Sequence, residues 1–460
     1  MFELDFNKSF AILGLGISGV ATLDFLRERG VEQILLSDSN AHDKLSAAAL
    51  QSIDANKEHV KCEFGIPHSE TCLEYDYLII SPGIAPEAEI LRKAREKNIS
   101  ILTELDLASE YLRTHKVSAG AYVGITGTNG KSTTTAWTAH ILGVPACGNI
   151  GLPFVQAVSE LPISKWYVCE MSSFQLQHSK IIKPSIAAIT NITPDHINWH
   201  GSWENYVKAK FKITQQQQVN DWLIIPPVEP MLSIETEANL FFVEASPKAV
   251  SLHNNAIWIN SSNQVQLRRE GQDHMLCRTD ELPLPGKHNL ENAMFAAAIA
   301  FLTGLSIEQV RSRLLSFRGL EHRLEFVCEL DGKRFYNDSK ATNPESSVVA
   351  LKAFDEGIIW LAGGRDKQTD LAELLETVKQ RVSSVILYGE AAERFHQELL
   401  KGGYMKPIHR VDTLKQAFER SLEEEGQVVL LSPACASFDQ FSNFEERGKV
   451  FKQLVGLKCE

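Results

Sequence analysis

Short apolar runs alternate with longer amphipathic stretches through the first hundred or so residues. The runs at 10–13, 33–37 and 77–80 have the length of strands, and the stretch at 20–29 has the spacing of a helix. Strands that alternate with helices in this way indicate βαβ units and a parallel sheet. We therefore predict a Rossmann-like domain over residues 1–103.

The same alternation continues into the middle of the chain. Apolar runs at 121–125, 165–169 and 186–192 predict a central parallel sheet of the P-loop ATPase-like type. Between 215 and 285 the pattern changes to short alternating pieces, which predict hairpins of a small subsidiary β-sheet. We assign these elements to a central domain over residues 104–319.

After a break at Gly319 the strand and helix rhythm returns a third time. The predicted strands there are at 334–336, 358–361, 385–388 and 428–431. A length of 460 residues has room for about three domains. The sequence therefore predicts an α/β protein of three domains, the last a Rossmann-like domain over 320–460.

Composition and charge narrow the possible partners. The chain has 46 Lys and Arg against 58 Asp and Glu, a net charge of −12, and no run of basic residues, which argues against nucleic acid. The N-terminus lacks the basic segment of a signal peptide, and the longest apolar stretch, 293–305, is too short to span a bilayer. The eight cysteines show no C-x-x-C spacing and are expected to be free thiols. We predict a cytoplasmic monomer that binds no membrane.

A glycine-rich loop joins a predicted strand to a predicted helix. The run at 121–125 leads into Gly127-Thr128-Asn129-Gly130-Lys131-Ser132-Thr133, and 133–142 contains no glycine or proline. Small residues let backbone N–H groups surround phosphates, while the lysine can reach the β- and γ-phosphate oxygens and the serine can ligate Mg²⁺. Ile125 stands where the general P-loop pattern has a glycine, so the loop is a compact variant. The pattern predicts a site for ATP.

A second glycine pattern follows the first apolar run. Gly14-Leu15-Gly16-Ile17-Ser18-Gly19 matches G-x-G-x-x-G, and Asp38 follows about twenty residues later. The arrangement is typical of dinucleotide binding, but the same turn accepts any pyrophosphate at a helix N-terminus, including that of a nucleotide sugar. This pattern alone leaves a nicotinamide or flavin cofactor and a nucleotide sugar open.

Polar residues follow the strands of both later domains. Ligands of open parallel sheets gather at the carboxyl ends of the strands. In the central domain Glu170 and His196 have such positions, and both are residue types that can hold Mg²⁺ beside phosphate oxygens and water. In the last domain Lys340, Lys367 and Ser437 have them, which favours a carboxylate or phosphate substrate.

Taken together, these motifs resemble those of the Mur ligase family over nearly the whole chain. The motifs are GTNGKS, GNIG at 148–151, SSFQL at 172–176, TPDH, DSKATN, LSPACAS and FEERG. The SSFQL, DSKATN and SFDQF segments look like those of the D-glutamate-adding branch of the family. The resemblance implies an ATP-dependent ligase of peptidoglycan precursor synthesis that uses two Mg²⁺ ions and joins D-glutamate to UDP-N-acetylmuramoyl-L-alanine. The reaction would pass through an acyl phosphate and a tetrahedral intermediate.

The resemblance also implies roles for individual residues. The UDP substrate would contact Ile17, Ser18, Asp38, Ser39, Gly83, Asn149 and His196. ATP would contact the phosphate loop, Asn289, Asn292, Arg323 and Asp338. Catalysis would involve Lys131, Glu170, His196 and Lys210, with Mg²⁺ on Ser132, Glu170, His196 and a carbamylated Lys210, chosen over Lys208. D-Glutamate would contact Lys340, Thr342, Lys367, Ser437 and Phe444.

Two positions depart from the family pattern. The connection from Lys131 to Gly148 is shorter, which shortens the helix behind the phosphate loop. Arg365 stands where a smaller residue is common, which bears on the role of Lys367.

Three alternatives remain open at this stage. Another ligase of the family, or a folylpolyglutamate-type amide ligase, would use a different amino acid or a folate. An NAD-dependent oxidoreductase would use the first glycine turn and leave GTNGKS without a role. An ATP-gated binding protein would bind nucleotide without releasing phosphate. The ligase interpretation requires the strand ends of three domains to meet in one cleft, with a hinge near Gly319.

Overall fold

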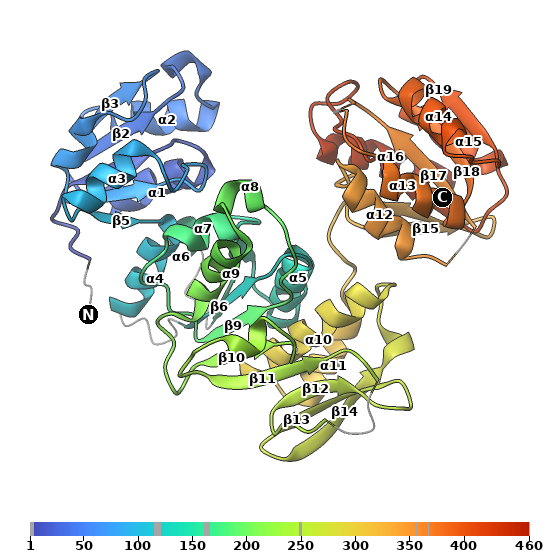
Figure 1. Ribbon diagram of the computed structural model, residues 1–460, viewed down its shortest axis with the longest axis horizontal. Coiled ribbons are helices and arrows are strands. Elements are labelled where there is room, and N and C mark those ends of the chain that lie inside the picture. The colour runs from blue at the N-terminus through green and yellow to red at the C-terminus, as the bar shows by residue number, and fades with distance from the viewer. Residues whose placement is uncertain are drawn as a thin grey trace. The chain divides into compact units, whose positions relative to one another are not determined.

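The computed structural model describes residues 4–114, 121–160, 166–247, 251–355, 357–366 and 368–459. The chain forms two compact units, the first Met1–Glu281 with Glu291–Leu315 and the second Leu282–Leu290 with Ser316–Glu460. The described residues build two sheets in the first unit and one in the second (Figure 1). Among them, no helix combines the length and the apolar character needed to cross a membrane.

The N-terminal sheet is parallel throughout, with the strand order β3-β2-β1-β4-β5. Its strands are β1 (Phe10–Leu13), β2 (Ile34–Asp38), β3 (Val60–Phe64), β4 (Tyr77–Ile80) and β5 (Ser100–Leu102). Its helices are α1 (Ile17–Glu28), η1 (His42–Lys44), α2 (Ala47–Asn56), η2 (Glu70–Glu74) and α3 (Glu89–Glu96). The chain order reverses at β1, the position where such sheets bind ligands. The predicted Rossmann-like fold is confirmed.

The central sheet has nine strands in the order β14-β13-β12-β11-β10-β9-β6-β8-β7. Its strands are β6 (Ala121–Thr126), β7 (Ala146–Gly148), β8 (Trp166–Glu170), β9 (Ile186–Ile189), β10 (Trp222–Ile225), β11 (Asn239–Glu244), β12 (Ala256–Ile259), β13 (Gln264–Arg269) and β14 (Gln272–Arg278). Its helices are α4 (Glu104–Thr114), α5 (Lys131–Leu142), α6 (Phe154–Glu160), α7 (Ser173–His178), α8 (Ile197–His200), α9 (Trp203–Phe211), η3 (Lys212–Thr214), η4 (Met231–Ser233), η5 (Thr279–Glu281), α10 (Lys287–Leu302) and α11 (Ile307–Leu315).

The hairpins predicted between 215 and 285 are present at one end of this sheet. β12, β13 and β14 pair antiparallel, but β12 also pairs in parallel with β11. They therefore extend the central sheet, and the prediction of a separate subsidiary sheet is wrong in that respect. The reason is that β11 would otherwise leave an edge of unpaired backbone groups.

The C-terminal sheet has the order β15-β16-β20-β17-β18-β19, with only the β15–β16 pair antiparallel among its described strands. Its strands are β15 (Glu325–Leu330), β16 (Lys333–Asn337), β17 (Ile358–Gly363), β18 (Val382–Tyr388), β19 (Ile408–Val411) and β20 (Val428–Leu431). Its helices are α12 (Pro344–Lys352), α13 (Ala372–Arg381), α14 (Ala392–Lys401), α15 (Leu414–Glu423) and α16 (Phe444–Cys459).

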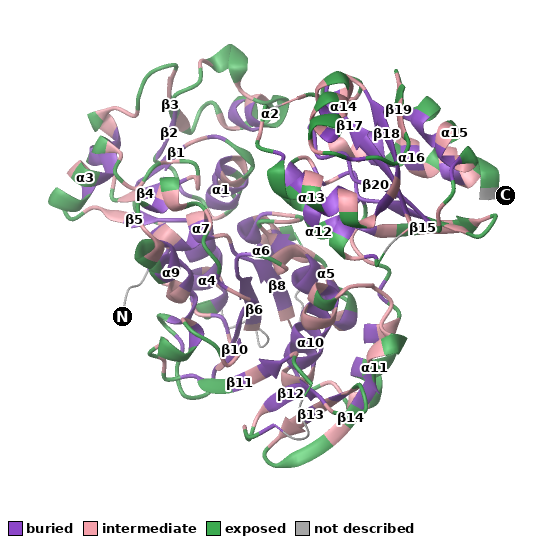
Figure 2. Cartoon of the chain, turned by 45° about the vertical axis from the view of Figure 1, so that its right-hand side comes forward, coloured by how far each residue is buried: buried purple, intermediate pink, exposed green. Residues whose placement is uncertain are grey.

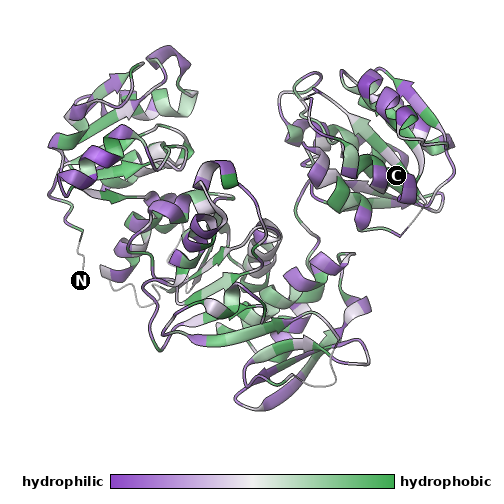
Figure 3. Cartoon of the chain, viewed as in Figure 1, coloured by the Kyte–Doolittle hydropathy of each residue, from purple (hydrophilic) through white to green (hydrophobic). Residues whose placement is uncertain are grey.

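Buried strands form the cores of the units (Figure 2). β2 and β17 are buried at every position, as expected for parallel strands covered by helices on both faces. Hydrophobic residues are concentrated in the strands, and hydrophilic residues on the outer helices and loops (Figure 3). Fully buried strands of this kind are recognisable in the sequence as continuous apolar runs.

The cysteines correct one expectation. Cys62, Cys72, Cys147, Cys169, Cys277 and Cys435 are free thiols, and of these only Cys62 is exposed. Cys328 is disulfide-bonded, so the prediction of eight free thiols is wrong there. Sequence spacing does not show which cysteines the fold brings together.

Candidate functional site

The phosphate loop between β6 and α5 has a backbone that its glycines permit. φ is +150° at Gly127 and +81° at Gly130. A Cβ at Gly127 would lie 2.0 Å from Thr190 Oγ1, and one at Gly130 would lie 2.3 Å from Asn292 Oδ1. No side chain caps the helix at Gly130. The start of α5 is therefore open to an anion, and the two glycines cannot be replaced without displacing neighbours.

The loop that follows β9 holds the phosphate loop in this shape. Asn191 accepts from the backbone N–H of Thr128 through its carbonyl (2.9 Å) and from that of Asn129 through Oδ1 (2.9 Å). The carbonyl of Asn129 in turn accepts from Asn191 Nδ2 (3.0 Å) and Thr190 Oγ1 (2.6 Å). Neighbouring side chains thus shape the cradle before any ligand binds.

Lys131 and Asn292 both lie against the phosphate loop. Lys131 Nζ donates to the carbonyl of Thr128 (2.7 Å), so its side chain folds back over the loop. Asn292, on α10, contacts Gly130 and accepts from Thr134 Oγ1 (3.2 Å). The fold therefore brings a residue predicted to contact ATP to the phosphate loop from far along the chain.

Glu170 ends β8 directly beside the loop. The pair Ile125 and Glu170 are register partners on β6 and β8. The carboxyl is 1% exposed, and Oε1 accepts from Asn149 Nδ2 (2.8 Å). Oε2 is buried and has no hydrogen-bond partner among the described residues. A bare buried carboxylate oxygen is costly, and a cation or a water would satisfy it.

Lys210, on α9, is 1% exposed and reaches the same loop. Its Nζ donates to the carbonyl of Gly127 (2.6 Å) and lies 4.7 Å from the centre of the Tyr206 ring. Burial, followed by the charge of Lys131, lowers the pKa of Lys210 to about 7. A large fraction of the amine is then uncharged at neutral pH, which makes it nucleophilic.

Tyr206, four residues before Lys210 on α9, is not among the residues to which the sequence assigned a role. It is 1% exposed, and its hydroxyl pairs with Thr128 Oγ1 (2.9 Å). Thr128 also donates to the carbonyl of Thr193 (3.1 Å). Tyr206 thus connects α9 to the phosphate loop, and the tyrosine one helical turn before a buried lysine was the available signal.

His196 is the most exposed of the four predicted catalytic residues, with a side chain 48% exposed. It has φ +51° before α8, and its ring packs 4.9 Å from that of Phe174. Its Nε2 lies 3.4 Å from Asp195 Oδ2. Asp195, Glu170 and Lys131 all act electrostatically on Lys210, so these groups share one environment at the carboxyl edge of the central sheet.

The donor set fits Mg²⁺ better than a metal held by protein alone. Within the described residues no group of three or more His, Cys, Asp or Glu side chains could hold a metal ion. Glu170 nevertheless offers a bare buried oxygen, and Ser132 opens the helix behind the loop. Mg²⁺ commonly binds one or two protein groups together with phosphate oxygens and water.

Hydrogen bonds from neighbouring residues hold the glycine turn after β1 in shape. Asp38 accepts from the backbone N–H groups of Leu15 (2.7 Å) and Asn40 (2.8 Å). Gly14 has φ +89°, a Cβ there would lie 2.7 Å from Ser81 Oγ, and that hydroxyl donates to its carbonyl (2.8 Å). Asp38 therefore shapes the turn.

Five of the predicted UDP contacts lie at the carboxyl edge of the same sheet, whereas Asn149 and His196 lie in the central domain, after β7 and before α8. Ile17 is 79% exposed, and Ser39 and Gly83 are exposed as well, whereas Ser18 is half-buried. No side chain caps α1 at Gly16. The open helix N-terminus suits a pyrophosphate.

In the second unit, β16 and β20 place Asp338 and Ser432 together. Ser432 Oγ donates to Asp338 Oδ2 (2.7 Å), and the backbone N–H of Leu324 donates to Oδ1 (3.1 Å). Burial raises the pKa of Asp338 to about 7. Because Arg323 directly precedes Leu324, the predicted ATP contacts Arg323 and Asp338 lie close to each other. Asn289, a third, donates to the carbonyl of Pro285 (2.7 Å).

The predicted D-glutamate contacts follow β16 and β20. Lys340 Nζ lies 5.9 Å from the centre of the Phe444 ring. The backbone N–H of Thr342 donates to the carbonyl of Lys340 (2.9 Å), and Ser437 is 2% exposed. Lys367 lies outside the described residues.

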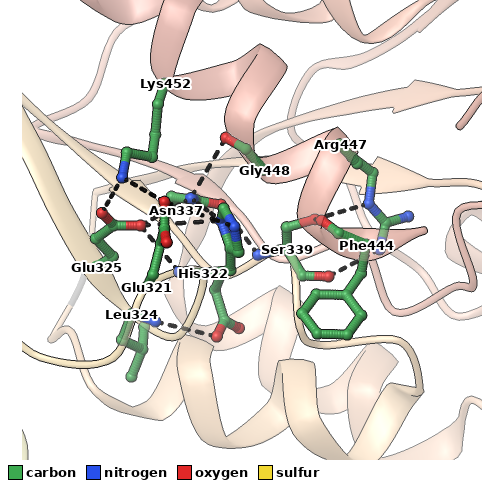
Figure 4. Close-up of polar contacts among 11 residues, drawn as sticks. Glu321, His322, Leu324, Glu325, Asn337, Ser339, Phe444, Arg447, Gly448 and Lys452 are labelled. Atoms are coloured by element: carbon green, nitrogen blue, oxygen red, sulfur yellow. Dashed lines mark hydrogen bonds and ion pairs between the residues drawn. The ribbon is translucent and has the colours of Figure 1, made fainter. Parts of the chain in front are cut away.

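Arg447 is a residue that the sequence reasoning did not single out. It is fully buried on α16, and its guanidinium donates to Ser339 Oγ (3.0 Å) and to the carbonyl of Ser339 (2.8 Å) (Figure 4). It also donates to the carbonyl of Cys435 (3.1 Å). Ser339 Oγ donates to the carbonyl of Phe444 (2.8 Å). Arg447 thus joins the loops that carry Lys340 and Ser437. The arginine inside FEERG was the available signal.

A second buried network positions the hairpin that carries Arg323. Asn337 Nδ2 donates to His322 Nδ1 (2.9 Å) and Glu325 Oε2 (3.0 Å), and Lys452 Nζ contacts Glu325 Oε1 (2.5 Å) (Figure 4). The carbonyl of His322 accepts from the backbone N–H of Lys340 (3.0 Å). The segment that carries Arg323 and the loop that carries Lys340 are therefore fixed relative to each other.

A phosphate loop beside a buried carboxylate and a buried lysine defines a P-loop-type nucleotide site. Family models match the Mur ligase MurD-like N-terminal domain at residues 8–103, the Mur ligase middle domain at 125–300 and the Mur ligase glutamate ligase domain at 322–435. The chain is 36% identical over 460 residues to the UDP-N-acetylmuramoylalanine–D-glutamate ligase of Caldanaerobacter subterraneus subsp. tengcongensis, covering 98% of each. It is 37% identical over 469 residues to that of Acidobacterium capsulatum, covering 98% of the chain and 96% of that protein. The chain therefore belongs to the Mur ligase family.

Solved structures agree at the level of the fold. The chain resembles the UDP-N-acetylmuramate–alanine ligase MurC of Thermotoga maritima with a TM-score of 0.54 and 18% identity, covering 98% of this chain and 99% of that one. It resembles MurF of Acinetobacter baumannii with a TM-score of 0.58 and 17% identity, covering 97% and 93%. The residue roles, the domain boundaries at 103/104 and 319/320, and the meeting of three domains in one cleft stay predictions.

Proposed function

We propose that this protein is an ATP-dependent ligase that joins D-glutamate to UDP-N-acetylmuramoyl-L-alanine in peptidoglycan precursor synthesis. The observation that carries the proposal is the gathering of Lys131, Glu170 and Lys210 around the phosphate loop, in a chain 36% identical to a relative of that name. The likeness to that relative extends over 98% of both chains, which covers every domain the reaction needs.

The chemistry needs ATP because a carboxylate is a poor electrophile. The L-alanine carboxylate would attack the γ-phosphorus of ATP, forming an acyl phosphate and releasing ADP. Lys131, which now folds over the loop, would turn to the β- and γ-phosphate oxygens and offset the charge on the transferring group. The backbone N–H groups behind Gly130 would hold the phosphates.

In the second step the D-glutamate amine attacks the acyl carbonyl. The tetrahedral intermediate then collapses with loss of phosphate, and nearby cationic donors stabilise its oxyanion. The amino acid would be bound by Lys340, Thr342, Lys367, Ser437 and Phe444. The hydrogen bonds of Arg447 would hold the loops that carry Lys340 and Ser437 in place. ATP would contact Arg323, Asp338, Asn289 and Asn292. The UDP substrate would contact Ile17, Ser18, Asp38, Ser39, Gly83, Asn149 and His196.

Two Mg²⁺ ions would be held by Ser132, Glu170, His196 and Lys210. When bound, Mg²⁺ neutralises phosphate charge and orients the transferring oxygens. Lys210 would act as a ligand after its amine adds to CO₂ to give a carbamate. The pKa of about 7 supports this step, since only the uncharged amine can add.

We further propose three domains with boundaries at 103/104 and 319/320, a hinge near Gly319, and a monomer that works in the cytoplasm. Domain closure would exclude water from the acyl phosphate. The N-terminal family model ends at residue 103 and the C-terminal one begins at residue 322, which supports the division.

The test is ADP release with UDP-N-acetylmuramoyl-L-alanine and either D- or L-glutamate. The proposal expects release with D-glutamate and little with L-glutamate. Release with another amino acid would identify a different ligase of the family. ATP binding without release would indicate a binding protein.

A further inference from the structure

Two buried carboxylates outside the proposed chemistry lie in the first turn of α4, the helix that leaves the N-terminal sheet. Asp106 is 0% exposed and Glu104 is 3% exposed. A buried carboxylate is costly unless hydrogen bonds compensate it. The partners of these two groups therefore indicate what the positions require.

Asp106 accepts hydrogen bonds from two parts of the chain that are far from each other in sequence. Its Oδ2 accepts from the backbone N–H (2.9 Å) and hydroxyl (3.0 Å) of Thr103, which is one half of a capping box at the start of α4. Its Oδ1 accepts from the backbone N–H groups of Lys180 and Ile181, both at 2.9 Å. Helix capping explains the first oxygen only. The second ties α4 to the segment behind α7.

Two further contacts reinforce this connection. Thr103 Oγ1 pairs with Ser179 Oγ (3.0 Å). Glu104 Oε2 accepts from the backbone N–H of Val155 (3.1 Å), in the first turn of α6. We refer to Thr103, Glu104 and Asp106 with Val155 and residues 179–181 as the clasp.

The clasp joins two edges that would bind different parts of one substrate. Thr103 follows β5, so it lies at the carboxyl edge that also carries the glycine turn after β1 and Gly83. On the other side, residues 179–181 follow α7, which begins three residues after Glu170. α7 is one short rigid helix of about 9 Å at the usual rise per residue. The clasp therefore fixes the spacing between the glycine turn and Glu170.

We propose that Asp106 is a positioning residue that seats the N-terminal sheet on the central sheet, so that a substrate held at the glycine turn presents its far end to the phosphate loop. The identity of that substrate as a UDP-sugar peptide rests on the proposed function. The seating matters because a misplacement of about 1 Å far from the chemistry can cost about a hundredfold in rate.

The direct test measures the distance between the two sheets. Cys62 on β3 is an exposed free thiol, and Ser262→Cys adds an exposed one in the turn between β12 and β13, so both accept nitroxide labels for pulsed EPR. We expect one narrow distance distribution in the otherwise native chain and a broader or shifted one with Asp106→Asn. Asparagine has the same size but turns an N–H donor toward backbone N–H donors.

Glu110→Gln is the matched control. Glu110 is also on α4 and 2% exposed, but it accepts from Arg113 (2.7 Å) and from the backbone N–H of Leu4 (3.4 Å), neither of which belongs to the clasp. The distribution should stay narrow. Ser179→Ala, which removes the pairing with Thr103, is the milder variant if Asp106→Asn does not fold, and it should broaden the distribution to a smaller extent.

Kinetics give the second measurement. Asp106→Asn should lower kcat by about 10- to 100-fold while the Kd values for UDP alone and for ATP stay unchanged, because each binds at one edge only. Unchanged distances in both clasp variants, or an equal loss in Glu110→Gln, would overturn the inference. Broadening by Asp106→Asn in a protein whose native form releases no ADP would support the clasp and reject the proposed function.

Discussion

Lys210 donates a 2.6 Å hydrogen bond to the carbonyl oxygen of Gly127, the first glycine of the phosphate loop. The amine proposed to react with CO₂ is thus bound to the loop proposed to hold ATP. Conversion of Nζ to a carbamate would leave it a single N–H and add a negative charge, and the charge of Lys131 acts on the same nitrogen. We therefore expect the state of Lys210 and the binding of nucleotide to be coupled.

Replacement of Lys131 separates ATP chemistry from substrate binding. We expect Lys131→Ala to lower ADP formation by about 100-fold or more, since the loop loses its cation at the transferring phosphate. Calorimetric binding of the UDP substrate should persist, because the glycine turn after β1 is a different site. Loss of both would contradict separate sites.

A rescue experiment tests the carbamate. Lys210→Ala should be nearly inactive, and short carboxylates such as formate or acetate should restore part of the rate by replacing the carbamate oxygens. Lys208→Ala is the matched control, since Lys208 is exposed on the same helix, and it should keep full activity. Failure of every carboxylate would remove the carbamate from the mechanism.

The pKa of Lys210 predicts a pH effect on stability. Its folded value of about 7 lies below the usual 10.5, so between these pH values the unfolded chain binds more protons than the folded one. The free energy of unfolding should therefore rise with pH in the native protein relative to Lys210→Met, with a slope difference of at most about 1.4 kcal/mol per pH unit. Urea unfolding in CO₂-free buffer measures it. Lys208→Met should show no slope difference from the native protein.

Two glycines at the ends of α5 form a matched pair. Gly130 has φ +81° and no room for a Cβ, whereas Gly143 has φ +70° and nothing within 4 Å of one. Alanine at either position costs about 1–2 kcal/mol of backbone strain. Only Gly130→Ala also displaces Asn292, so it alone should weaken ATP binding measured by calorimetry. An equal ATP Kd in both variants would show that the Gly130 contact is unimportant.

Arg447 should matter through the loops it joins. Arg447→Ala leaves the carbonyls of Ser339 and Cys435 without this donor, which should cost about 3 kcal/mol or more of unfolding free energy. The KM for D-glutamate should rise while the Kd for the UDP substrate stays unchanged. Arg447→Lys keeps the charge but not the planar guanidinium, so its unfolding free energy and its KM for D-glutamate should lie between those of the native protein and Arg447→Ala. A uniform loss of all binding would point to a purely structural role.

Local patterns predicted several elements to the residue. The strands at 10–13, 77–80 and 428–431 have the predicted bounds, because each is a continuous apolar run between polar turns. α10 begins at Lys287, before the start of the apolar stretch at 293–305. Its first two turns carry Asn289 and Asn292, and polar residues there do not reveal a helix by hydrophobicity.

The candidate site divides in the same way. The phosphate loop was readable because consecutive residues supply its glycines, lysine and serine. Arg447, Asp106 and Tyr206 were not, because each acts through partners far away in sequence, such as Cys435 or Lys180. An isolated charged residue in a helix usually faces solvent, so pattern alone assigns it no role.

By itself the sequence determined the three α/β patterns, the phosphate loop and the glycine turn, since strand period, helix period and backbone freedom are properties of neighbouring residues. Only the tertiary structure decided that β12 joins β11, that Glu170 keeps a bare buried oxygen and that Lys210 has a pKa of about 7. Those outcomes depend on which distant groups exclude water from one another, and desolvation and pairing between distant residues are not encoded in any short stretch of the chain.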